Sequence, residues 1–369
     1  MAKHRQPNNV TGYILPLIFP IGQVQIDKST IREVRFLKKV GSIREVAQVT
    51  GLSTATISRV VNGANNVSEK TRERVLNACR KLDYLPNSAA RALTTSRSRT
   101  IAAIIPTIEH SVFAKYVAAL EQTLNELNYS LVLAISPAGG DPEVEAARKL
   151  LGMGADAIIL SGCDHSVELV DLLGRREIPH VFSSVWQPDS PTPTIGYDNY
   201  HLANQAVEYL KSKGHEKIAI IHGPLQASDR TRARKAGAQS ADSIDVDLSF
   251  FETELSVGGG KRATEQILSN GIECTAVLCF SDVLALGTYF CLQEAGISIP
   301  NQISVMGFDN LDWSIHIEPS LTTINLPAKR MGHEVARQLV GHLEQSVPIE
   351  PTIFHGELIE RQSVVQIEG

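Results

Sequence analysis

The sequence contains few of the residue patterns on which enzymes and metal proteins depend. Its five cysteines are an odd number without short paired spacing: Cys79, Cys163, Cys274, Cys279 and Cys291. This pattern predicts core thiols in a reducing cytoplasm rather than a disulfide framework or a zinc site. The histidines form no cluster with metal-ligand spacing, and no G-x-S-x-G nucleophile motif is present. We therefore expect no cofactor, no metal and no catalytic activity.

Nucleotide-binding loops are also missing. The run Gly258-Gly259-Gly260-Lys261 lacks the spacing and the Ser or Thr of a phosphate loop, so it indicates a flexible helix start. The run Gly152-Met153-Gly154 precedes an apolar segment instead of following one, which excludes a dinucleotide fingerprint.

The N-terminal 41 residues carry no targeting or membrane signal. The apolar segment 13–21 contains two prolines and is too short to span a bilayer. A signal peptide would also need a small-residue cleavage site. We expect residues 1–41 to be a disordered extension or the result of a misplaced start codon, and the protein to be cytoplasmic and associated with the nucleoid.

Positive charge is scarce overall but concentrated in one segment. The whole chain has a net charge of −5, whereas residues 42–99 carry ten Lys and Arg against four acidic residues, a net charge of +6. Residues 100–369 carry 18 basic and 34 acidic residues, a net charge of −16. A basic head on an acidic body predicts that the head alone contacts nucleic-acid phosphates.

Residues 42–62 (SIREVAQVTGLSTATISRVVN) have the pattern of two short helices joined by a tight turn. Ser42 and Glu45 form a capping box, and Gly51 can adopt the left-handed conformation of the turn. Ser53 caps the second helix, and the buried side of that helix would comprise Ile57, Val60 and Val61. This pattern predicts a helix-turn-helix, whose second helix enters the major groove of DNA. An ordinary helical hairpin is the alternative.

The residues expected to contact DNA in the major groove are short side chains and one arginine: Ser53, Thr54, Ala55, Ser58, Arg59 and Asn62. Arginine can pair bidentately with guanine, and a small apolar group can contact a thymine methyl. A third helix is expected from the Ser68 cap to Leu82, with Val75, Leu76, Cys79 and Leu82 facing the core.

The remainder of the chain alternates between β-rich and helical segments. The apolar β-rich runs are 101–106, 130–136, 156–161, 180–184, 217–223, 275–280 and 303–309. This alternation predicts a parallel α/β body. Some 270 residues exceed a usual single core, so we expect two lobes, with a ligand at the carboxyl ends of the strands.

These segments together resemble the lactose/galactose-repressor (LacI/GalR) family of bacterial transcription regulators. The resemblance is most specific in residues 42–62 and in 67–93 (VSEKTRERVLNACRKLDYLPNSAARAL), and it continues to residue 369. Landmarks in order are GYDN (196–199), HGPLQASDRTRARKAG (222–237), SDVLALG (281–287), GFDN (307–310), PSLTTINLP (319–327) and ELIERQS (357–363). The resemblance implies an all-α helix-turn-helix DNA-binding head (42–86), a hinge helix and linker (87–99), and an α/β two-lobed periplasmic-binding-protein-like body (100–369) for effector binding and dimerisation.

The resemblance further implies that the hinge helix folds only when two subunits meet on operator DNA, where Leu93 wedges into the minor groove. The sequence is compatible with this role, because a helix of about seven residues does not persist alone in water. A leucine buried between domains is the alternative. The chain ends six residues after Ser363 without a leucine-heptad tail, so we expect a homodimer on a pseudo-palindromic operator.

The resemblance also implies an effector pocket between the lobes. Arg234 matches the ligand-binding arginine, Asp282 the acid that binds sugar hydroxyls or a base edge, and Phe113 an aromatic residue that packs on the ligand. Ser184 and Leu255 stand at pocket positions where many members carry an acid and an aromatic residue. The alternatives are a surface arginine, a helix-capping aspartate and a core phenylalanine.

The implied function is a sequence-specific, DNA-binding transcription regulator, most often a repressor, whose operator affinity depends on a sugar, sugar derivative, nucleoside or purine. The sign of the effect stays open. The departures in the pocket also leave open effector loss, or a phosphorylated or acidic effector, for which Arg230 and Arg232 could supply charge. The rival hypothesis is a solute-binding protein of a transport system, which would need an export signal and no basic head.

Overall fold

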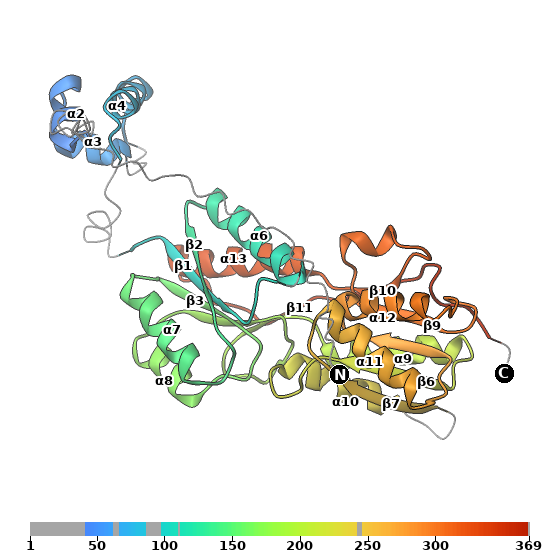
Figure 1. Ribbon diagram of the computed structural model, residues 1–369. Coiled ribbons are helices and arrows are strands. Elements are labelled where there is room, and N and C mark those ends of the chain that lie inside the picture. Colours follow the sequence, from blue (N-terminus) through green and yellow to red (C-terminus); the bar gives the residue numbers. More distant parts are fainter. Residues whose placement is uncertain (1–40, 62–65, 86–96, 110, 242–245, 368–369) are drawn as a thin grey trace, which may run out of the picture. The chain divides into compact units, whose positions relative to one another are not determined.

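The computed structural model describes residues 41–61, 66–85, 97–109, 111–241 and 246–367. The chain divides into two compact units, residues 1–87 and residues 88–369, whose elements are labelled in Figure 1. Residues 1–40, Asn62 and most of the predicted hinge segment, including Leu93, lie outside the described residues.

Among its described residues, the first unit contains three helices: α2 (Ile43–Thr50), α3 (Thr54–Val61) and α4 (Glu69–Lys81). The predicted capping box of α2 is confirmed, because Ser42 N donates to Glu45 Oε2 at 2.8 Å and Glu45 N donates to Ser42 Oγ at 3.3 Å. Gly51 ends α2 with a φ of 59°, and Ser53 Oγ caps α3 by accepting from Thr56 N at 3.1 Å.

A small apolar core holds these helices together. Its buried members are Val46, Ile57, Val60, Val75, Ala78 and Cys79. The inward orientation predicted for Leu76 is wrong, since this side chain is 42% exposed. Position 78 faces the core instead, because Val75, Ala78 and Cys79 follow the i, i+3, i+4 spacing of one helix face.

The second unit consists of two α/β lobes, each built on a six-stranded sheet. The first sheet is entirely parallel and has the order β11 (Thr352–Ile353), β5 (Thr194–Gly196), β4 (His180–Ser183), β3 (Ala157–Ser161), β1 (Thr100–Ile105), β2 (Ser130–Ile135). The second has the order β12 (Glu357–Ile359), β10 (Thr322–Asn325), β9 (Ser304–Asp309), β8 (Ala276–Cys279), β6 (Lys217–His222), β7 (Asp247–Glu252), with only β12 antiparallel.

Helices cover both faces of each sheet. In the first lobe, α6 (Ser111–Glu126) and α13 (Ala328–Gln345) pack side by side on one face, with α7 (Asp141–Gly152) and α8 (Val167–Arg175) on the other (Figure 1). In the second lobe the corresponding pairs are α9 (Asn199–Ser212) with α10 (Asp229–Ser240), and α11 (Val257–Ser269) with α12 (Asp282–Glu294). A 3₁₀ helix, η1 (Asp312–Ile315), follows β9.

The central strands are apolar on both sides because both faces of each sheet are covered. In β1, Ile101 and Ala103 belong to one core cluster, whereas Ala102 and Ile104 belong to another. All seven predicted strands are confirmed. The sequence did not predict β5, β10, β11 and β12, which have two to four residues, or β7, which lies at a sheet edge and is only half-buried.

The chain crosses between the lobes three times: after β5, after β10 and between β11 and β12. Each lobe is therefore assembled from discontinuous stretches of sequence, and the three crossings lie side by side at one junction. At the last crossing, a Cβ at Gly356 would lie 3.0 Å from Asn325 O, so the crossings are tightly packed there.

The glycine run 258–260 lies in the first turn of α11, in agreement with the predicted helix start. Its glycines allow close packing rather than flexibility. A Cβ at Gly260 would lie 2.1 Å from Leu284 O, and one at Gly287 would lie 2.1 Å from Val257 O. Helices α11 and α12 therefore touch at backbone distance, which leaves no room for larger residues.

All five cysteines are free thiols; Cys163 and Cys274 are half-buried and the others buried.

Candidate functional site

The second helix of the first unit presents one polar face to solvent. Thr54, Ala55 and Arg59 are exposed on α3, as is the preceding Ser53, and Ser58 is half-buried. On the opposite side, Ile57 and Val60 are buried in the core. This is the orientation that a helix needs to lie in a major groove with its small N-terminal side chains near base edges.

The same unit exposes positive charge on several of its helices. Its exposed cations are Arg44, Arg59, Lys70, Arg74, Arg80 and Lys81. Exposed Lys and Arg side chains are the groups that bind backbone phosphates and release counterions. The unit therefore combines an exposed polar helix face with exposed cations, the two kinds of group that contact bases and phosphates.

The second unit contains a cavity of ≈230 Å³ between its two lobes. Four of the five predicted pocket residues line it: Phe113, Ser184, Arg234 and Leu255. Pro106 follows β1, Gly223 follows β6 and Ser281 follows β8, so the cavity lies at the carboxyl ends of the strands, as expected. The wall is largely apolar and aromatic, with Tyr116, Tyr197, Phe280, Leu326 and Met331 among its residues.

Arg234 is held rigidly and is not the surface residue of the alternative interpretation. It projects from α10, is 9% exposed, and donates from Nε to Asn199 Oδ1 at 3.0 Å and from Nη1 to Phe280 O at 2.6 Å. Its guanidinium lies 4.3 Å from the centroid of the Phe308 ring. Burial lowers the pKa of Arg234 from its ordinary value. The side chain is therefore pre-positioned at the cavity wall as a planar donor.

The carboxylate that reaches this cavity belongs to Asp309, not to Asp282. Asp282 is fully buried and is not a lining residue; it accepts from Thr323 Oγ1 at 2.6 Å and from Leu311 N at 2.7 Å. Burial and the neighbouring Asp309 raise the pKa of Asp282. The expected contact of Asp282 with an effector is thus replaced by a structural role behind the cavity wall.

Asp309 ends β9 and lines the cavity together with Ser281, which donates to Asp309 Oδ2 at 2.8 Å. Burial raises the pKa of Asp309 to about 6, against the opposing effect of the Arg234 charge. Sequence analysis recognised the GFDN segment but did not assign Asp309 to the pocket. Its place directly at the end of a buried strand was the signal that could have identified it.

Two further features distinguish the cavity from ordinary core. Ser184 has a φ of +67° and Asp309 a φ of +116°, both in the region that non-glycine residues rarely adopt. Such strain is concentrated at functional sites. The hydroxyl of Tyr116, buried at the wall, makes no hydrogen bond of acceptable geometry within the described part of the chain. A ligand hydroxyl or ring nitrogen could satisfy it.

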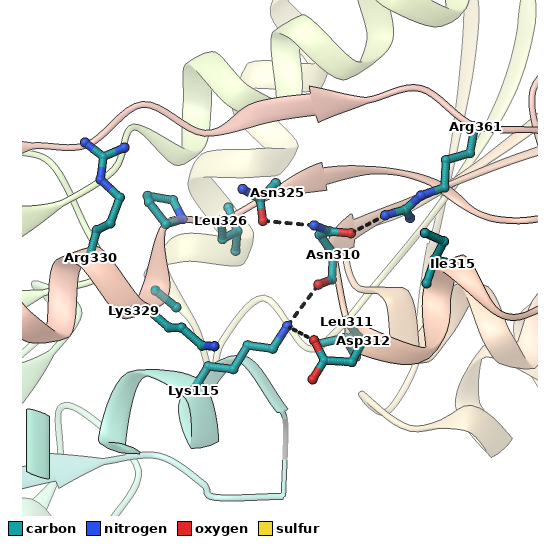
Figure 2. A pocket seen from close by; sticks show the side chains of 12 residues that line it. Lys115, Asn310, Leu311, Asp312, Ile315, Asn325, Leu326, Lys329, Arg330 and Arg361 are labelled. Atoms are coloured by element: carbon teal, nitrogen blue, oxygen red, sulfur yellow. Dashed lines mark hydrogen bonds and ion pairs between the residues drawn. The ribbon is translucent and has the colours of Figure 1, made fainter. Parts of the chain in front are cut away.

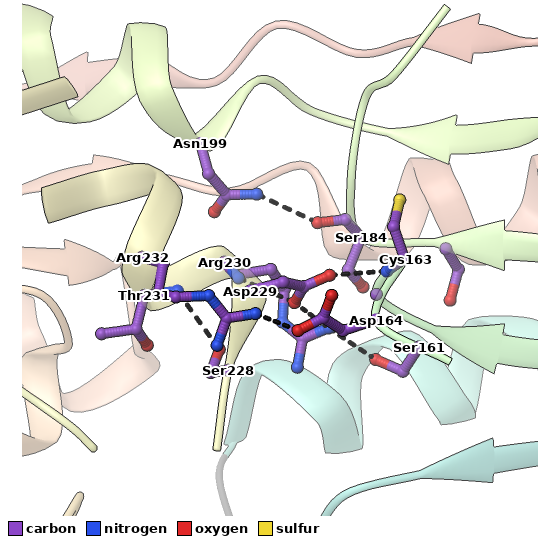
Figure 3. Close-up of polar contacts among 12 residues, drawn as sticks. Ser161, Cys163, Asp164, Ser184, Asn199, Ser228, Asp229, Arg230, Thr231 and Arg232 are labelled. Carbon is purple, nitrogen blue, oxygen red and sulfur yellow. Dashed lines mark hydrogen bonds and ion pairs between the residues drawn. The ribbon is translucent and has the colours of Figure 1, made fainter. Parts of the chain in front are cut away.

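Polar contacts next to the cavity connect the two lobes (Figure 3). Asp229 of α10 accepts from Cys163 N at 2.5 Å, and Arg230 Nη1 donates to Ser161 Oγ at 3.4 Å. Arg232 pairs with Asp164 across the same gap. Arg230 Nη1 lies 3.3 Å from Asp229 Oδ1. Arg230 and Arg232 therefore each have a carboxylate partner, and neither offers an uncompensated charge to an acidic effector.

Within the described ranges there is no group of three or more His, Cys, Asp or Glu residues that could hold a metal ion. No helix among the described residues combines the length and the apolar character that crossing a bilayer demands.

Comparison with known proteins identifies the family to which both units belong. Residues 42–87 match the model of the bacterial regulatory proteins of the lacI family. Residues 98–354 match the model of periplasmic binding proteins and the sugar binding domain of the LacI family. The HTH-type transcriptional repressor PurR of Vibrio atlanticus is 31% identical, over 88% of this chain and 99% of its own length. Catabolite control protein A of Priestia megaterium is 29% identical, over 82% of this chain and 93% of its own.

Among solved structures, the lac repressor dimer bound to operator and the anti-inducer ONPF has a TM-score of 0.78 and 27% identity, covering 89% of this chain and all of that chain. A LacI-family regulator from Enterococcus faecium with bound ribose has a TM-score of 0.66 and 26% identity, covering 73% of this chain and all of its own. Both family models and the full-length relatives agree with the two units described above. The chain therefore belongs to the LacI family, DNA-binding transcription regulators whose body binds a small-molecule effector.

Proposed function

We propose that this protein acts as a cytoplasmic, homodimeric transcriptional repressor without enzymatic activity. The observation that carries the proposal is the combination, in one chain, of an exposed polar face on α3 and a strained interlobe cavity walled by Arg234 and Asp309. The repressor named PurR and the lac repressor dimer on its operator support the repressor and dimer assignments. A transport protein with the same body would have no use for the basic first unit.

In this proposal Thr54, Ala55 and Arg59 read bases in the major groove, with Ser53 and Ser58 beside them. Two such helices in an isologous dimer read two half-sites. Asn62 and the wedge Leu93, which lie outside the described residues, complete the contact surface. Loss of the Leu93 side chain should reduce operator bending, measured by the mobility of circularly permuted DNA fragments.

The effector is a small polar compound with at least one flat apolar face. Arg234 supplies a donor fork and Asp309 an acceptor, while Phe113 and Leu255 supply apolar surface. A sugar derivative, a nucleoside or a purine presents this combination of hydroxyl or ring-nitrogen groups and apolar faces. Such a ligand contacts both lobes at once, so it stabilises one relative arrangement of the lobes and thereby changes operator affinity.

The test starts from a random duplex library. Purified full-length protein is used to select duplexes, and selected and random duplexes are compared by fluorescence anisotropy at fixed salt. A thermal-shift screen of sugars, nucleosides and purines identifies the effector, which is then added to the DNA titration. We expect a selected palindrome-like sequence whose affinity changes with one compound. Failure to prefer any duplex over random competitor, with or without these compounds, would refute the proposal.

A further inference from the structure

A second hollow in the body carries positive charge that the proposed effector cavity does not use. It has a volume of ≈420 Å³ and its lining includes four cations, Lys115, Lys329, Arg330 and Arg361 (Figure 2). Asp312 is the one carboxylate among the described residues that line it. Residues 100–369 have a net charge of −16, so the hollow reverses the sign of the body around it. A ligand attracted to it would be an anion.

The protein itself neutralises little of this charge. Lys115 Nζ lies 2.8 Å from Asp312 Oδ1 and donates to Asn310 O at 3.0 Å. Lys115 lowers the pKa of Asp312, but this carboxylate is 93% exposed and can balance only one of the four cations. Arg361 donates to neutral oxygens, at 2.7 Å to Asn310 Oδ1 and at 2.7 Å to Leu321 O. Burial lowers the pKa of Arg361, and the nearby Asp282 carboxylate opposes this effect, so Arg361 is partly balanced within the protein.

Lys329 and Arg330 are the cations that are open to a ligand. Both are exposed, and neither forms an ion pair with a carboxylate of the described residues. The Arg330 guanidinium lies 5.4 Å from the centroid of the Phe354 ring, and in Figure 2 it extends away from Lys115 and Lys329, so it adds positive charge at the edge of the hollow. In Figure 2 the side chains of Lys329 and Lys115 extend into the same part of the hollow. Two ammonium groups that share a hollow repel each other unless an anion lies between them.

The start of α13 adds hydrogen-bond donors at the same place. The helix begins at Ala328 after Pro327, and no side chain caps it. The amides of Lys329 and Arg330 belong to its first turn and therefore have no acceptor within the helix. The positive end of the helix dipole lies in the same segment, since Pro327, Ala328, Lys329 and Arg330 all line the hollow.

The position of the hollow gives it a role in lobe geometry. Lys115 lies on α6 of the first lobe, and Lys329 and Arg330 follow the second crossing between the lobes. Asn310 and Arg361 belong to the second lobe. Only Leu326 and Ala328 are shared with the lining of the effector cavity. An anion bound here contacts both lobes without occupying that cavity, so it stabilises the present arrangement of the lobes.

We propose that this hollow is a second ligand site that binds a phosphate group, either as free phosphate or as the phosphoryl group of a small metabolite. Binding neutralises the cations around Lys115 and Lys329 and favours the lobe arrangement in which Lys115 reaches Asn310. The site would couple the phosphate supply, or the level of a phosphorylated compound, to the same lobe movement that the effector controls.

The test uses the full-length protein and two probes, inorganic phosphate and glycerol phosphate, with ionic strength held constant by sodium chloride. Binding is followed by the ³¹P line width and by calorimetry. The double variant Lys329→Gln/Arg330→Gln removes the two open cations. Its control, Lys149→Gln/Arg175→Gln, removes two exposed cations of the first lobe that line neither cavity. Thermal unfolding verifies that both variants fold, and the single variant Lys329→Gln replaces the double variant if it does not.

We expect saturable binding of at least one probe by the parent and the control, and at least tenfold weaker binding by the Lys329→Gln/Arg330→Gln variant. Binding of both probes would assign the site to the phosphate group itself; binding of glycerol phosphate alone would assign it to a phosphate ester. No saturable binding by the parent, or equal binding by the two variants, would overturn the proposal. Because no step involves DNA, these outcomes are independent of whether an operator is found.

Discussion

The functional groups of the first unit are exposed to solvent, whereas those of the second unit are buried. In the first unit, Arg59 and Thr54 stand on an exposed helix face above a small core. In the second, Arg234 and Asp309 are 9% and 7% exposed and are already bonded to their surroundings. The first unit can therefore exchange its contact residues at little cost to folding, whereas the second recognises a ligand with groups on which its own packing depends.

Backbone packing should show the largest difference between the units. A Cβ at Gly237 would lie 1.9 Å from Tyr200 O, so Gly237→Ala forces α9 and α10 apart. We expect a loss of more than about 3 kcal/mol in the free energy of unfolding of the body. Both tryptophans, Trp186 and Trp313, lie in the body, so their fluorescence during urea unfolding reports this loss.

Gly51→Ala is the matching change in the first unit. Its φ of 59° disfavours alanine by about 1–2 kcal/mol, but the nearest atom to a Cβ, Arg74 Nη2, is 3.7 Å away. We expect the tryptophan transition to stay unchanged in this variant. If Gly51→Ala and Gly237→Ala shifted the tryptophan unfolding transition equally, the two units would not unfold independently.

Removal of the buried arginine should have the next largest effect. Arg234→Ala deletes the donor fork and leaves the Asp309 charge and the Phe280 carbonyl without their partner. We expect effector affinity to fall by about 2–4 kcal/mol, while DNA affinity without effector stays the same. Titration calorimetry measures the effector affinity, and fluorescence anisotropy measures the DNA affinity.

Lys235→Ala is the control on the same helix, since Lys235 does not line the cavity and lies over the Phe250 ring. If Arg234→Ala retained the full effector response, Arg234 would have no part in ligand recognition.

The exposed arginine should matter for specificity rather than for folding. Arg59→Ala should reduce discrimination at one base position by about 1–3 kcal/mol and leave unfolding unchanged. Lys81→Ala, in the same unit, should lower the affinity for all duplexes by the same factor, because a phosphate contact carries no sequence information. Competition titrations with single-base operator variants at fixed salt distinguish the two. Unaltered discrimination in Arg59→Ala would remove this residue from base readout.

The smallest expected effect is a change in the pH dependence of stability, which depends on Asp309. Its pKa of about 6 in the folded protein lies above the ordinary value of 3.8, so its contribution to stability is complete below pH 3.8 and is lost as the pH rises through 6. Asp309→Asn removes this dependence. Relative to the parent, the variant should therefore gain about 1 kcal/mol in the free energy of unfolding between pH 5 and pH 8. A constant difference across this range would mean that Asp309 does not titrate there.

The sequence predicted those features that depend on local pattern. The caps Ser42 and Ser53, the turn at Gly51 and the seven predicted strands each follow from a few adjacent residues. The five strands that were missed depend on partners distant in the sequence; the two-residue β11, for example, exists only because β5 lies beside it. Such short segments have no periodicity of their own.

The candidate site shows the same limit at the level of single side chains. The family resemblance assigned the pocket acid to Asp282, and Asp309 was not considered, although the structure places Asp309 at the cavity. Which acid faces the cavity depends on the rotation of α12 and on Thr323 and Leu311, which capture the Asp282 carboxylate. The same resemblance assigned Arg234 to the pocket, and the structure places this residue at the cavity wall.

The repeated crossing of the chain between lobes also has a consequence for biosynthesis. The first lobe cannot be completed until the ribosome has added α13 and β11, the latter ending at residue 353, whereas the last described helix of the DNA-binding unit ends at Lys81. At about 5–20 residues per second, this interval lasts on the order of tens of seconds. The residues of the DNA-binding unit are therefore synthesised well before the body that binds the effector is complete.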